Sequence, residues 1–228
     1  MSNTEQTHVM KVIKVETLAP QIIKLLMQAE HPISYTAGDY VMLGFAEDDL
    51  KPFSIASAPR EDGLIECHIR KQSNSEWMVK LFTVTAGNTL VMQGPKAQMA
   101  LQPSHEAMIF VAGGTGFAPM KAILEESIRQ GIKVPISFYW GARIAEDLYM
   151  HNWMIDLSQK HPHIEYIPVI SEQTQEWHGE SGLVHKKMLE QHPKLNHSTI
   201  YMCGPWDMTQ TAKQDFIAAG ANSNNIIH

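Results

Sequence analysis

Hydrophobic and polar positions follow two different patterns in the two halves of the chain. Up to residue 94, apolar residues alternate with polar ones in short segments, as between His8 and Glu16. Turn signals such as Glu61-Asp62-Gly63 separate the segments. A period of two is typical of β-strands. The predicted strands are 8–16, 21–28, 38–45, 52–57, 64–70 and 89–93. Several short strands at this spacing predict a small β-sandwich or barrel.

One segment of this half has the pattern of a helix. Ser73 and Glu76 have the spacing of a capping box, and Trp77 and Leu81 fall on one helical face. Ser73 and Ser75 are both candidates for helix caps. We therefore expect one short helix between the fifth and sixth strands.

The second half alternates apolar strands with helical segments, after a connector at 94–105 that contains two prolines. Its predicted strands are 107–112, 134–140, 164–170 and 198–203, and its predicted helices are 117–130, one within 146–160, 183–191 and 206–219. This alternation predicts a parallel sheet with helices on both faces. The predicted fold is an antiparallel β-barrel (residues 1–103) followed by a doubly wound α/β domain (residues 104–228), with the cleft between two such domains as the natural ligand site.

Composition excludes several classes of protein. The chain has 228 residues, of which 44% are hydrophobic and 18% charged, and its net charge is -6, which disfavours a nucleic-acid partner. No apolar run approaches the roughly 18 residues of a membrane span, and the first residues lack the plan of a signal peptide. We therefore expect a cytoplasmic protein with neither a membrane nor a nucleic-acid partner.

Metal chemistry is not expected either. Cys67 and Cys203 are too far apart in the sequence to form a metal or iron–sulfur cluster by themselves, and free thiols are the commoner state in a reducing compartment. His161 and His163 flank a proline, and no third ligand stands at a recognisable spacing.

A glycine-rich turn follows the first strand of the α/β half, at Gly113-Gly114-Thr115-Gly116. Glycines let backbone approach a ligand closely, and the N-terminus of the next helix presents unpaired N–H groups and a positive dipole end. Pro119 fits the first turn of that helix. The spacing differs from the Gly-x-Gly-x-x-Gly dinucleotide fingerprint. On these residues alone, an ordinary strand-to-helix turn is an open alternative.

Three further segments carry chemical groups. Lys51-Pro52-Phe53-Ser54 offers a cation, a ring and a hydroxyl suited to a flat ligand with polar edges, although proline is also typical of an edge strand. Arg143 follows the second α/β strand and can hold a ribose or a phosphate, or lie solvated in a loop. Cys203-Gly204-Pro205 ends the fourth α/β strand, where a buried structural cysteine is the alternative. If these interpretations hold, three strand ends converge on one cleft.

These four segments, in this order on a β-barrel followed by an α/β domain, resemble the ferredoxin–NADP⁺ reductase superfamily. The resemblance is closest to the bacterial NAD(P)H:flavin oxidoreductases, including the luciferase-associated branch, and it covers nearly the whole chain. Its markers are Lys51-Pro-Phe-Ser54 for Arg-Pro-Phe-Ser, Gly113-Gly-Thr-Gly-Phe117, Tyr139-Trp-Gly141 with Arg143, and Cys203-Gly-Pro205. It implies reduction of free FMN, FAD or riboflavin by NADH or NADPH, with hydride transfer from nicotinamide C4 to flavin N5 and release of the reduced flavin.

The resemblance also implies roles for residues of the barrel. The isoalloxazine ring is expected to lie against Pro52 and Phe53, with the Ser54 hydroxyl bonded to N5 and Lys51 beside it. The backbone of His68, Ile69 and Arg70 is expected to line the same flavin pocket.

In the α/β domain the resemblance implies a nicotinamide site. Gly113, Gly114, Thr115 and Gly116, with Pro119, and Cys203, Gly204 and Pro205 are expected to frame the nicotinamide ring. Cys203 is expected near C4, and Arg143 at the adenosine side. The predicted catalytic residues are Ser54, Thr115 and Cys203.

Three departures from the family pattern bear on how flavin binds. No glycine occurs between Gly63 and Gly87, where relatives that keep FAD permanently have a glycine and Ser/Thr segment that grips the pyrophosphate. This favours flavin as a loosely held substrate. Lys51 lacks the bidentate fork of the family's arginine. Relatives also continue beyond the residues that match His228 into a tail whose aromatic residues cover the flavin, so either the tail is missing from this sequence or the flavin face is more open.

Two alternatives stay open on the sequence. One is an electron-transfer reductase that holds FAD and serves a protein partner such as an oxygenase; the other is a nucleotide-binding module that has lost the chemistry. For the flavin reductase, ferric complexes, luciferase or another monooxygenase are the acceptors of reduced flavin that the family suggests. The residues do not decide between NADH and NADPH.

Overall fold

The computed structural model describes residues 6–102, 106–172 and 174–228. The chain divides into two compact units: Met1–Leu101 with Lys121–Gln130, and Gln102–Met120 with Gly131–His228. Helix α2 (Phe117–Arg129) therefore contributes its first residues to the second unit and the rest to the first.

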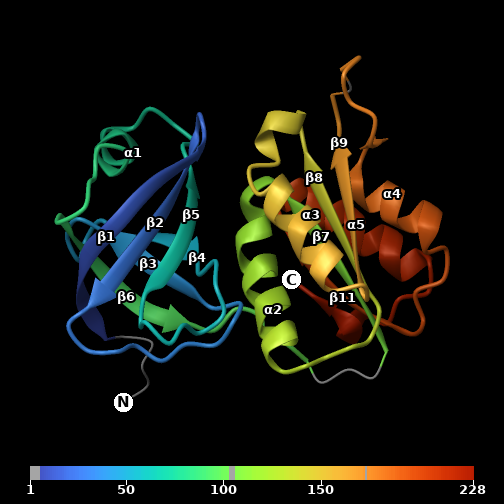
Figure 1. Cartoon of the computed structure of the whole chain (residues 1–228), viewed down its shortest axis with the longest axis horizontal. Helices are drawn as coiled ribbons and strands as arrows, with labels where there is room; N and C mark the ends of the chain where they lie inside the picture. Colours follow the sequence, from blue (N-terminus) through green and yellow to red (C-terminus); the bar gives the residue numbers. More distant parts are fainter. Residues whose placement is uncertain (1–5, 103–105, 173) are drawn as a thin grey trace. The chain divides into compact units, whose positions relative to one another are not determined.

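The first unit contains a six-stranded antiparallel sheet (Figure 1). Its strands are β1 (Thr7–Ala19), β2 (Ile22–Ala29), β3 (Tyr40–Gly44), β4 (Lys51–Ser54), β5 (Ile65–Arg70) and β6 (Thr89–Lys96), in the order β4-β3-β6-β1-β2-β5. A bridge between Ile55 and Cys67 joins the two outer strands, so the sheet closes into the expected barrel. Met10 and Val12 of β1 face its core, whereas Val9 is exposed, as period-two alternation requires.

Helix α1 (Glu76–Leu81) lies where the sequence predicts it, but the predicted capping box is wrong. The Ser75 hydroxyl accepts a hydrogen bond from the Met78 N–H at 3.3 Å, and Ser73 donates to Ser75 instead of capping the helix. Because the helix begins at Glu76, this residue stands at the first helical position and not at the third, which a capping box needs. The predicted connector also begins later, since β6 runs to Lys96.

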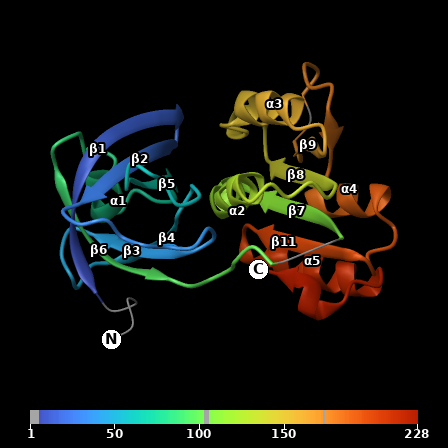
Figure 2. The same ribbon diagram turned by 60° about the horizontal axis from the view of Figure 1, so that its bottom comes forward.

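The second unit contains a six-stranded parallel sheet with helices on both faces, which confirms the doubly wound fold (Figure 2). Its strands are β7 (Ala107–Gly113), β8 (Ile136–Ala142), β9 (Ile164–Ile170), β10 (Glu180–Ser181), β11 (Ser198–Cys203) and β12 (Ile226–Ile227), in the order β10-β9-β8-β7-β11-β12. The sequence does not predict β10 and β12, because two residues are too short for any period to show.

Two helices cover each face of this sheet. Helices α4 (Val184–Gln191) and α5 (Trp206–Ala218) pack through residues such as Met188 and Phe216 against one face. Helix α3 (His151–Lys160) and the first turn of α2 cover the other face, where Trp153 meets the ring of Phe117 edge-on. The chain runs outward from β7 through β8 and β9 and then returns to β11 on the other side of β7. The topological switch point therefore lies between β7 and β11.

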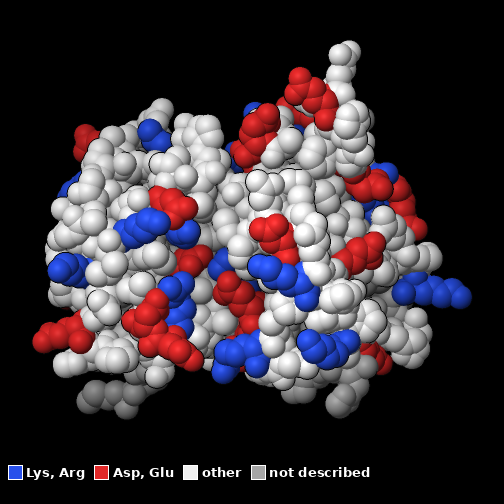
Figure 3. All heavy atoms as spheres, in the orientation of Figure 1, with Lys and Arg blue, Asp and Glu red and all other residues white. Residues whose placement is uncertain are grey.

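Charged side chains of both signs are interspersed over the described part of the face in Figure 3. Within the described residues, no helix is long and apolar enough to cross a membrane.

Candidate functional site: a glycine rim and a barrel pocket

The glycine turn stands at the switch point of the parallel sheet. Strand β7 ends at Gly113, and a short 3-10 turn over Gly114–Gly116 leads into α2. A Cβ on Gly116 would lie 2.2 Å from the carbonyl oxygen of Cys203, so no larger residue fits against the end of β11. Gly114 has a φ of +54°, and a Cβ on Gly113 would lie 2.6 Å from the sulfur of Met208. Gly116 is thus required by the backbone packed against it and Gly114 by its positive φ, whereas a side chain at Gly113 would displace the end of Met208.

Aromatic rings support this turn from beneath. The Trp140 indole N–H donates to the Gly114 carbonyl at 2.9 Å, and the Trp140 ring stacks on Phe117 with centroids 3.9 Å apart. Trp140 ends up fully buried. The sequence analysis included Trp140 only as part of a motif. Its support of the glycine turn could have been predicted from its position at the end of a strand, because a buried indole N–H needs a hydrogen-bond partner.

The two predicted groups at this rim are neutral. Burial raises the pKa of the Cys203 thiol to about 11, so the sulfur stays protonated at neutral pH. The Thr115 side chain is half-buried, and its hydroxyl has no hydrogen-bond partner among the described residues. Pro119 is buried in the first turn of α2, whereas Pro205 is exposed as the N-cap of α5.

Arg143 lies at the same edge of the sheet, two residues beyond Gly141, which pairs with Gly113 in the ladder. Its Nε atom is 3.2 Å from a carboxylate oxygen of Glu172, and the Glu172 N–H donates to the Arg143 carbonyl at 2.8 Å. Both side chains are more than half exposed, so the ion pair is weak and open to a competing anion. The structure thus brings β7, β8 and β11 together with their predicted residues at one edge.

The barrel contributes a separate pocket of about 380 Å³ in the first unit. The register of β3 and β4 pairs Tyr40 with Ser54 and Met42 with Pro52, so these four side chains share one face. The pocket is lined by Tyr40, Met42, Pro52, Phe53, Ser54 and Gln98. Among the described residues the Ser54 hydroxyl has no hydrogen-bond partner, so it is available to a ligand.

Lys51 and Phe53 point to the opposite side of β4, toward α1. The Phe53 ring lies parallel to that of Trp77 with centroids 6.0 Å apart, and the Lys51 ammonium lies 5.1 Å from the Trp77 centroid. Trp77, which the sequence assigned only to a helix face, supports β4 from this side. Its contacts hold β4 against the core.

The three predicted residues of β5 do not line this pocket. His68 is fully buried as a side chain and bonds to Glu66 at 2.9 Å, and Ile69 packs in the barrel core. Burial lowers the pKa of His68, which keeps the ring neutral. The side chains of His68 and Ile69 are therefore not available to a flavin, and the side chain of Arg70 is half-buried.

The hydroxyls of Ser54 and Thr115 and the neutral thiol of Cys203 can therefore bind and orient a ligand without gaining or losing a proton at neutral pH. Within the described residues, no group of three or more His, Cys, Asp or Glu side chains is placed to hold a metal ion.

Two family models match the two halves of the chain separately. Residues 9–101 match the family model described as an oxidoreductase FAD-binding domain, and residues 110–214 match the oxidoreductase NAD-binding domain.

Two curated relatives are equally similar to the chain. The NAD(P)H-flavin reductase of Aliivibrio fischeri is 32% identical over 213 residues, which cover 90% of this chain and 90% of that protein. The CDP-6-deoxy-L-threo-D-glycero-4-hexulose-3-dehydrase reductase of Yersinia pestis is 32% identical over 226 residues, which cover 96% of this chain and 67% of that protein.

Solved structures share the fold at lower identity. The Amycolatopsis cytochrome P450 reductase GcoB superposes with a TM-score of 0.90 at 23% identity, over 97% of this chain and 68% of that chain. A ferredoxin NADP⁺ reductase from Neisseria gonorrhoeae with bound FAD and NADP superposes with a TM-score of 0.80 at 22% identity, over 94% of this chain and 92% of that chain.

Proposed function

The chain belongs to the NAD(P)H-flavin reductases of the ferredoxin–NADP⁺ reductase family, and we propose that it reduces free FMN, FAD or riboflavin with NADH or NADPH. A hydride passes from nicotinamide C4 to flavin N5, and the products are NAD(P)⁺ and reduced flavin. The protein's task in such a transfer is to hold two rings about 3–3.5 Å apart and to exclude water.

The observation that carries this proposal is that the three groups assigned to the reacting atoms are neutral, while the cations Lys51 and Arg143 are assigned other roles. Hydride transfer between two rings needs no acid or base at the reacting carbon and nitrogen. The hydroxyls of Ser54 and Thr115 and the protonated thiol of Cys203 meet that need. In this proposal Ser54 donates a hydrogen bond to N5, while Thr115 and Cys203 lie against the nicotinamide.

The remaining residues bind rather than react. We assign Pro52 to one face of the flavin. Phe53 lines the same pocket, but its ring and the Lys51 ammonium lie toward Trp77 on the other side of β4, so we expect these two side chains to support the strand. The backbone of His68, Ile69 and Arg70 is proposed to lie around the flavin. The nicotinamide dinucleotide is assigned to the rim: Gly113, Gly114, Gly116, Pro119, Gly204 and Pro205 near its ring, and Arg143 at its adenosine side. We assign flavin binding to residues 1–103 and nicotinamide binding to residues 104–228, in an enzyme that we propose is cytoplasmic.

The structure of the first turn of α1 favours flavin as a substrate that is released from the protein after reduction. This helix has only six residues, and the hydroxyl of its cap Ser75 already accepts the Met78 N–H. No glycine between Gly63 and Gly87 brings backbone close to a pyrophosphate there. Reduced flavin then diffuses to an acceptor, such as a ferric complex or a monooxygenase.

A second candidate is supported by the equal similarity to the Yersinia pestis reductase, which is longer than this chain. In that case the protein holds FAD and passes electrons to a protein partner. The two functions can be distinguished by experiment, because the flavin reductase releases reduced flavin after each turnover and the electron-transfer reductase keeps its FAD.

Oxidation of NADH and NADPH by the purified, extensively desalted protein tests the proposal, with FMN, FAD and riboflavin each added in turn. We expect a colourless protein whose nicotinamide oxidation depends on added flavin. No oxidation with any flavin would refute the enzyme. A protein that stays yellow and reduces its own flavin, without stimulation by free flavin, would favour the electron-transfer candidate.

A further inference from the structure

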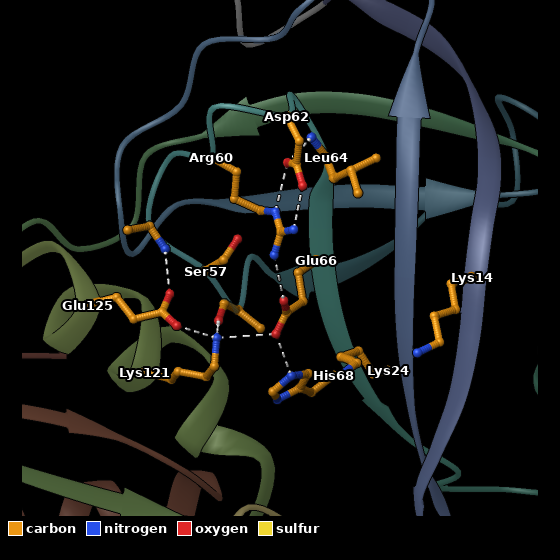
Figure 4. A network of polar contacts seen from close by, with 12 residues as sticks. Lys14, Lys24, Ser57, Arg60, Asp62, Leu64, Glu66, His68, Lys121 and Glu125 are labelled. Atoms are coloured by element: carbon orange, nitrogen blue, oxygen red, sulfur yellow. Dashed lines mark hydrogen bonds and ion pairs between the residues drawn. The ribbon is translucent and has the colours of Figure 1, made fainter. Parts of the chain in front are cut away.

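A buried network of charges contacts the segment that follows β4, the strand that carries Ser54. Lys121 of α2 is 4% exposed, and its ammonium lies 2.7 Å from a carboxylate oxygen of Glu125 and 3.2 Å from one of Glu66 (Figure 4). Glu66 also accepts from His68 at 2.9 Å and meets Arg60 at 3.4 Å. All of these residues belong to the first unit.

Such a network is an unusual choice if stability is all that it provides. Taking charges out of water costs several kcal/mol each, and apolar residues of similar size often stabilise a core equally well. What charged groups add is direction, because each hydrogen bond fixes the position of its partner. The atoms that this network holds in place therefore indicate its role.

The network holds the segment that leaves β4. The Lys121 ammonium donates to the Ala56 carbonyl at 2.9 Å, and the Ala56 N–H donates to the Glu66 carbonyl at 2.7 Å. The Ala58 N–H donates to the second carboxylate oxygen of Glu125 at 3.0 Å. Both polar backbone groups of Ala56, and the N–H of Ala58, are thus fixed by this set of residues.

Tyr35 also binds the segment that follows β4. Its hydroxyl donates to the Ala58 carbonyl at 2.7 Å and lies 3.0 Å from the Ser57 hydroxyl. Since the single phenolic proton goes to the carbonyl, Ser57 donates to Tyr35. The segment from Ala56 to Ala58 is therefore held by directed bonds along its length, and it begins two residues after Ser54.

We propose that Lys121 and Glu125 are positioning residues for flavin reduction: by fixing Ala56 and Ala58 they set where β4 presents the Ser54 hydroxyl. This inference rests on the proposed function. Neither side chain touches the flavin in this proposal. An error of an ångström in a hydrogen-bonding hydroxyl lowers the rate of the chemical step, while the affinity for the nicotinamide dinucleotide depends on the other unit.

Glu125 offers the sharpest test, because two substitutions separate its bond to backbone from its charge. Glu125→Gln keeps an oxygen for the Ala58 N–H but turns its NH2 group toward the Lys121 ammonium, so the contact with Lys121 is lost, whereas Glu125→Ala loses both contacts. We expect kcat for flavin reduction to fall about tenfold in Glu125→Ala and less than about threefold in Glu125→Gln, with the KM for NADH unchanged within about twofold. Flavin bleaching in a rapid-mixing experiment should show the same split.

Lys121 gives the second pair of variants. Lys121→Met removes the donor to Ala56, and we expect kcat to fall about tenfold or more; Lys121→Arg retains a cation and donors and should recover most of the rate. Arg129→Met is the matched control on the same helix, since Arg129 pairs with Glu126 outside the network. It should leave kcat unchanged.

The outcomes distinguish this inference from the proposed function. If the wild-type protein oxidises neither NADH nor NADPH with free flavin, the proposed function fails. If the wild type is active and folded Glu125→Ala keeps its kcat, or loses kcat to the same extent as Glu125→Gln, the positioning role is wrong. A drop in melting temperature with unchanged kcat would show a purely structural network. Should Lys121→Met fail to fold, the Glu125 pair decides alone, because its side chain is 29% exposed.

Discussion

The two surfaces that carry the proposed chemistry are held in place by different forces. In the barrel, charged side chains hold the backbone of Ala56 and Ala58, which follow the pocket residue Ser54 in the chain. At the rim of the parallel sheet, glycines pack directly on neighbouring backbone, and buried aromatic rings lie beneath. The first arrangement depends on ionised side chains, whereas the second depends on close backbone packing at Gly116. An added methyl group should therefore disturb the rim most, and a change of pH should disturb the barrel most.

The largest effect is expected from adding one methyl group to the rim. In Gly116→Ala the new Cβ would lie 2.2 Å from the Cys203 carbonyl oxygen and 2.8 Å from the Gly204 nitrogen, both of which are backbone atoms. The two turns must separate, and we expect activity to fall by about a hundredfold or more. The assay is kcat/KM for NADH, with circular dichroism as the test of folding.

Gly63→Asn is the matched control for this substitution. Gly63 has a φ of +69° with open space around its Cβ position, and asparagine tolerates that conformation better than other residues do. Its activity should stay near the wild-type value. Equal losses in the two variants would contradict the steric account of the rim.

Acid should weaken the barrel through Glu66. Burial alone would raise the pKa of this carboxyl, but the bonds from His68 and Lys121 outweigh it and hold the pKa at about 2. A lowered carboxyl pKa stabilises the folded state above the unfolded value of about 4.5, and this stability is lost as pH falls through about 2. The linkage amounts to at most about 3 kcal/mol at neutral pH.

Glu66→Gln should therefore unfold more easily than the wild type at pH 7, with the difference vanishing near pH 2. Urea unfolding midpoints across this range measure it. Asp62→Asn is the control: the bond from Arg60 lowers the pKa of Asp62 to about 2 as well, but its exposed pair should contribute less than about 1 kcal/mol. A pH-independent gap between Glu66→Gln and the wild type would show that the carboxylate charge is not what stabilises the barrel.

Removing the Ser54 hydroxyl tests the pocket itself. Ser54→Ala loses the proposed bond to flavin N5 but no bond to a described protein atom, so the fold should be unaffected. We expect kcat for flavin reduction to fall about tenfold, the effect of one hydrogen bond that strengthens during the transfer. If only the KM for the nicotinamide dinucleotide changed, Ser54 would have no part in flavin reduction.

Periodicity predicted most of the fold because its strands and helices are long enough to repeat a pattern. β9 and β11 begin and end where the sequence places them, whereas β10 and β12 are two residues long and carry no period. The capping box failed because Ser73 and Ser75 have the same chemistry, and only the first helical residue decides which of them caps α1.

The network around Lys121 shows what a sequence does not reveal about a site. Glu66, His68, Lys121 and Glu125 are residue types that usually lie at a surface, and they come from segments more than 50 positions apart. Nothing local marks them as buried, because their partners are supplied by the fold. The glycine turn, in contrast, was visible at once, since close backbone approach requires glycine in the sequence itself.

The smallest effect is expected at the exposed ion pair of the rim. Arg143 is proposed to bind the adenosine side of the dinucleotide, and Glu172 competes for it at 3.2 Å. Arg143→Ala should raise the KM for the dinucleotide by about threefold to tenfold with kcat nearly unchanged. Glu172→Gln should free the guanidinium and remove a negative charge, so the KM for NADPH should fall more than the KM for NADH, because only NADPH carries a 2′-phosphate. Steady-state assays with both dinucleotides measure the ratio. An unchanged KM in Arg143→Ala would remove Arg143 from the site, and the rim would then bind its ligand through backbone, hydroxyl and thiol alone.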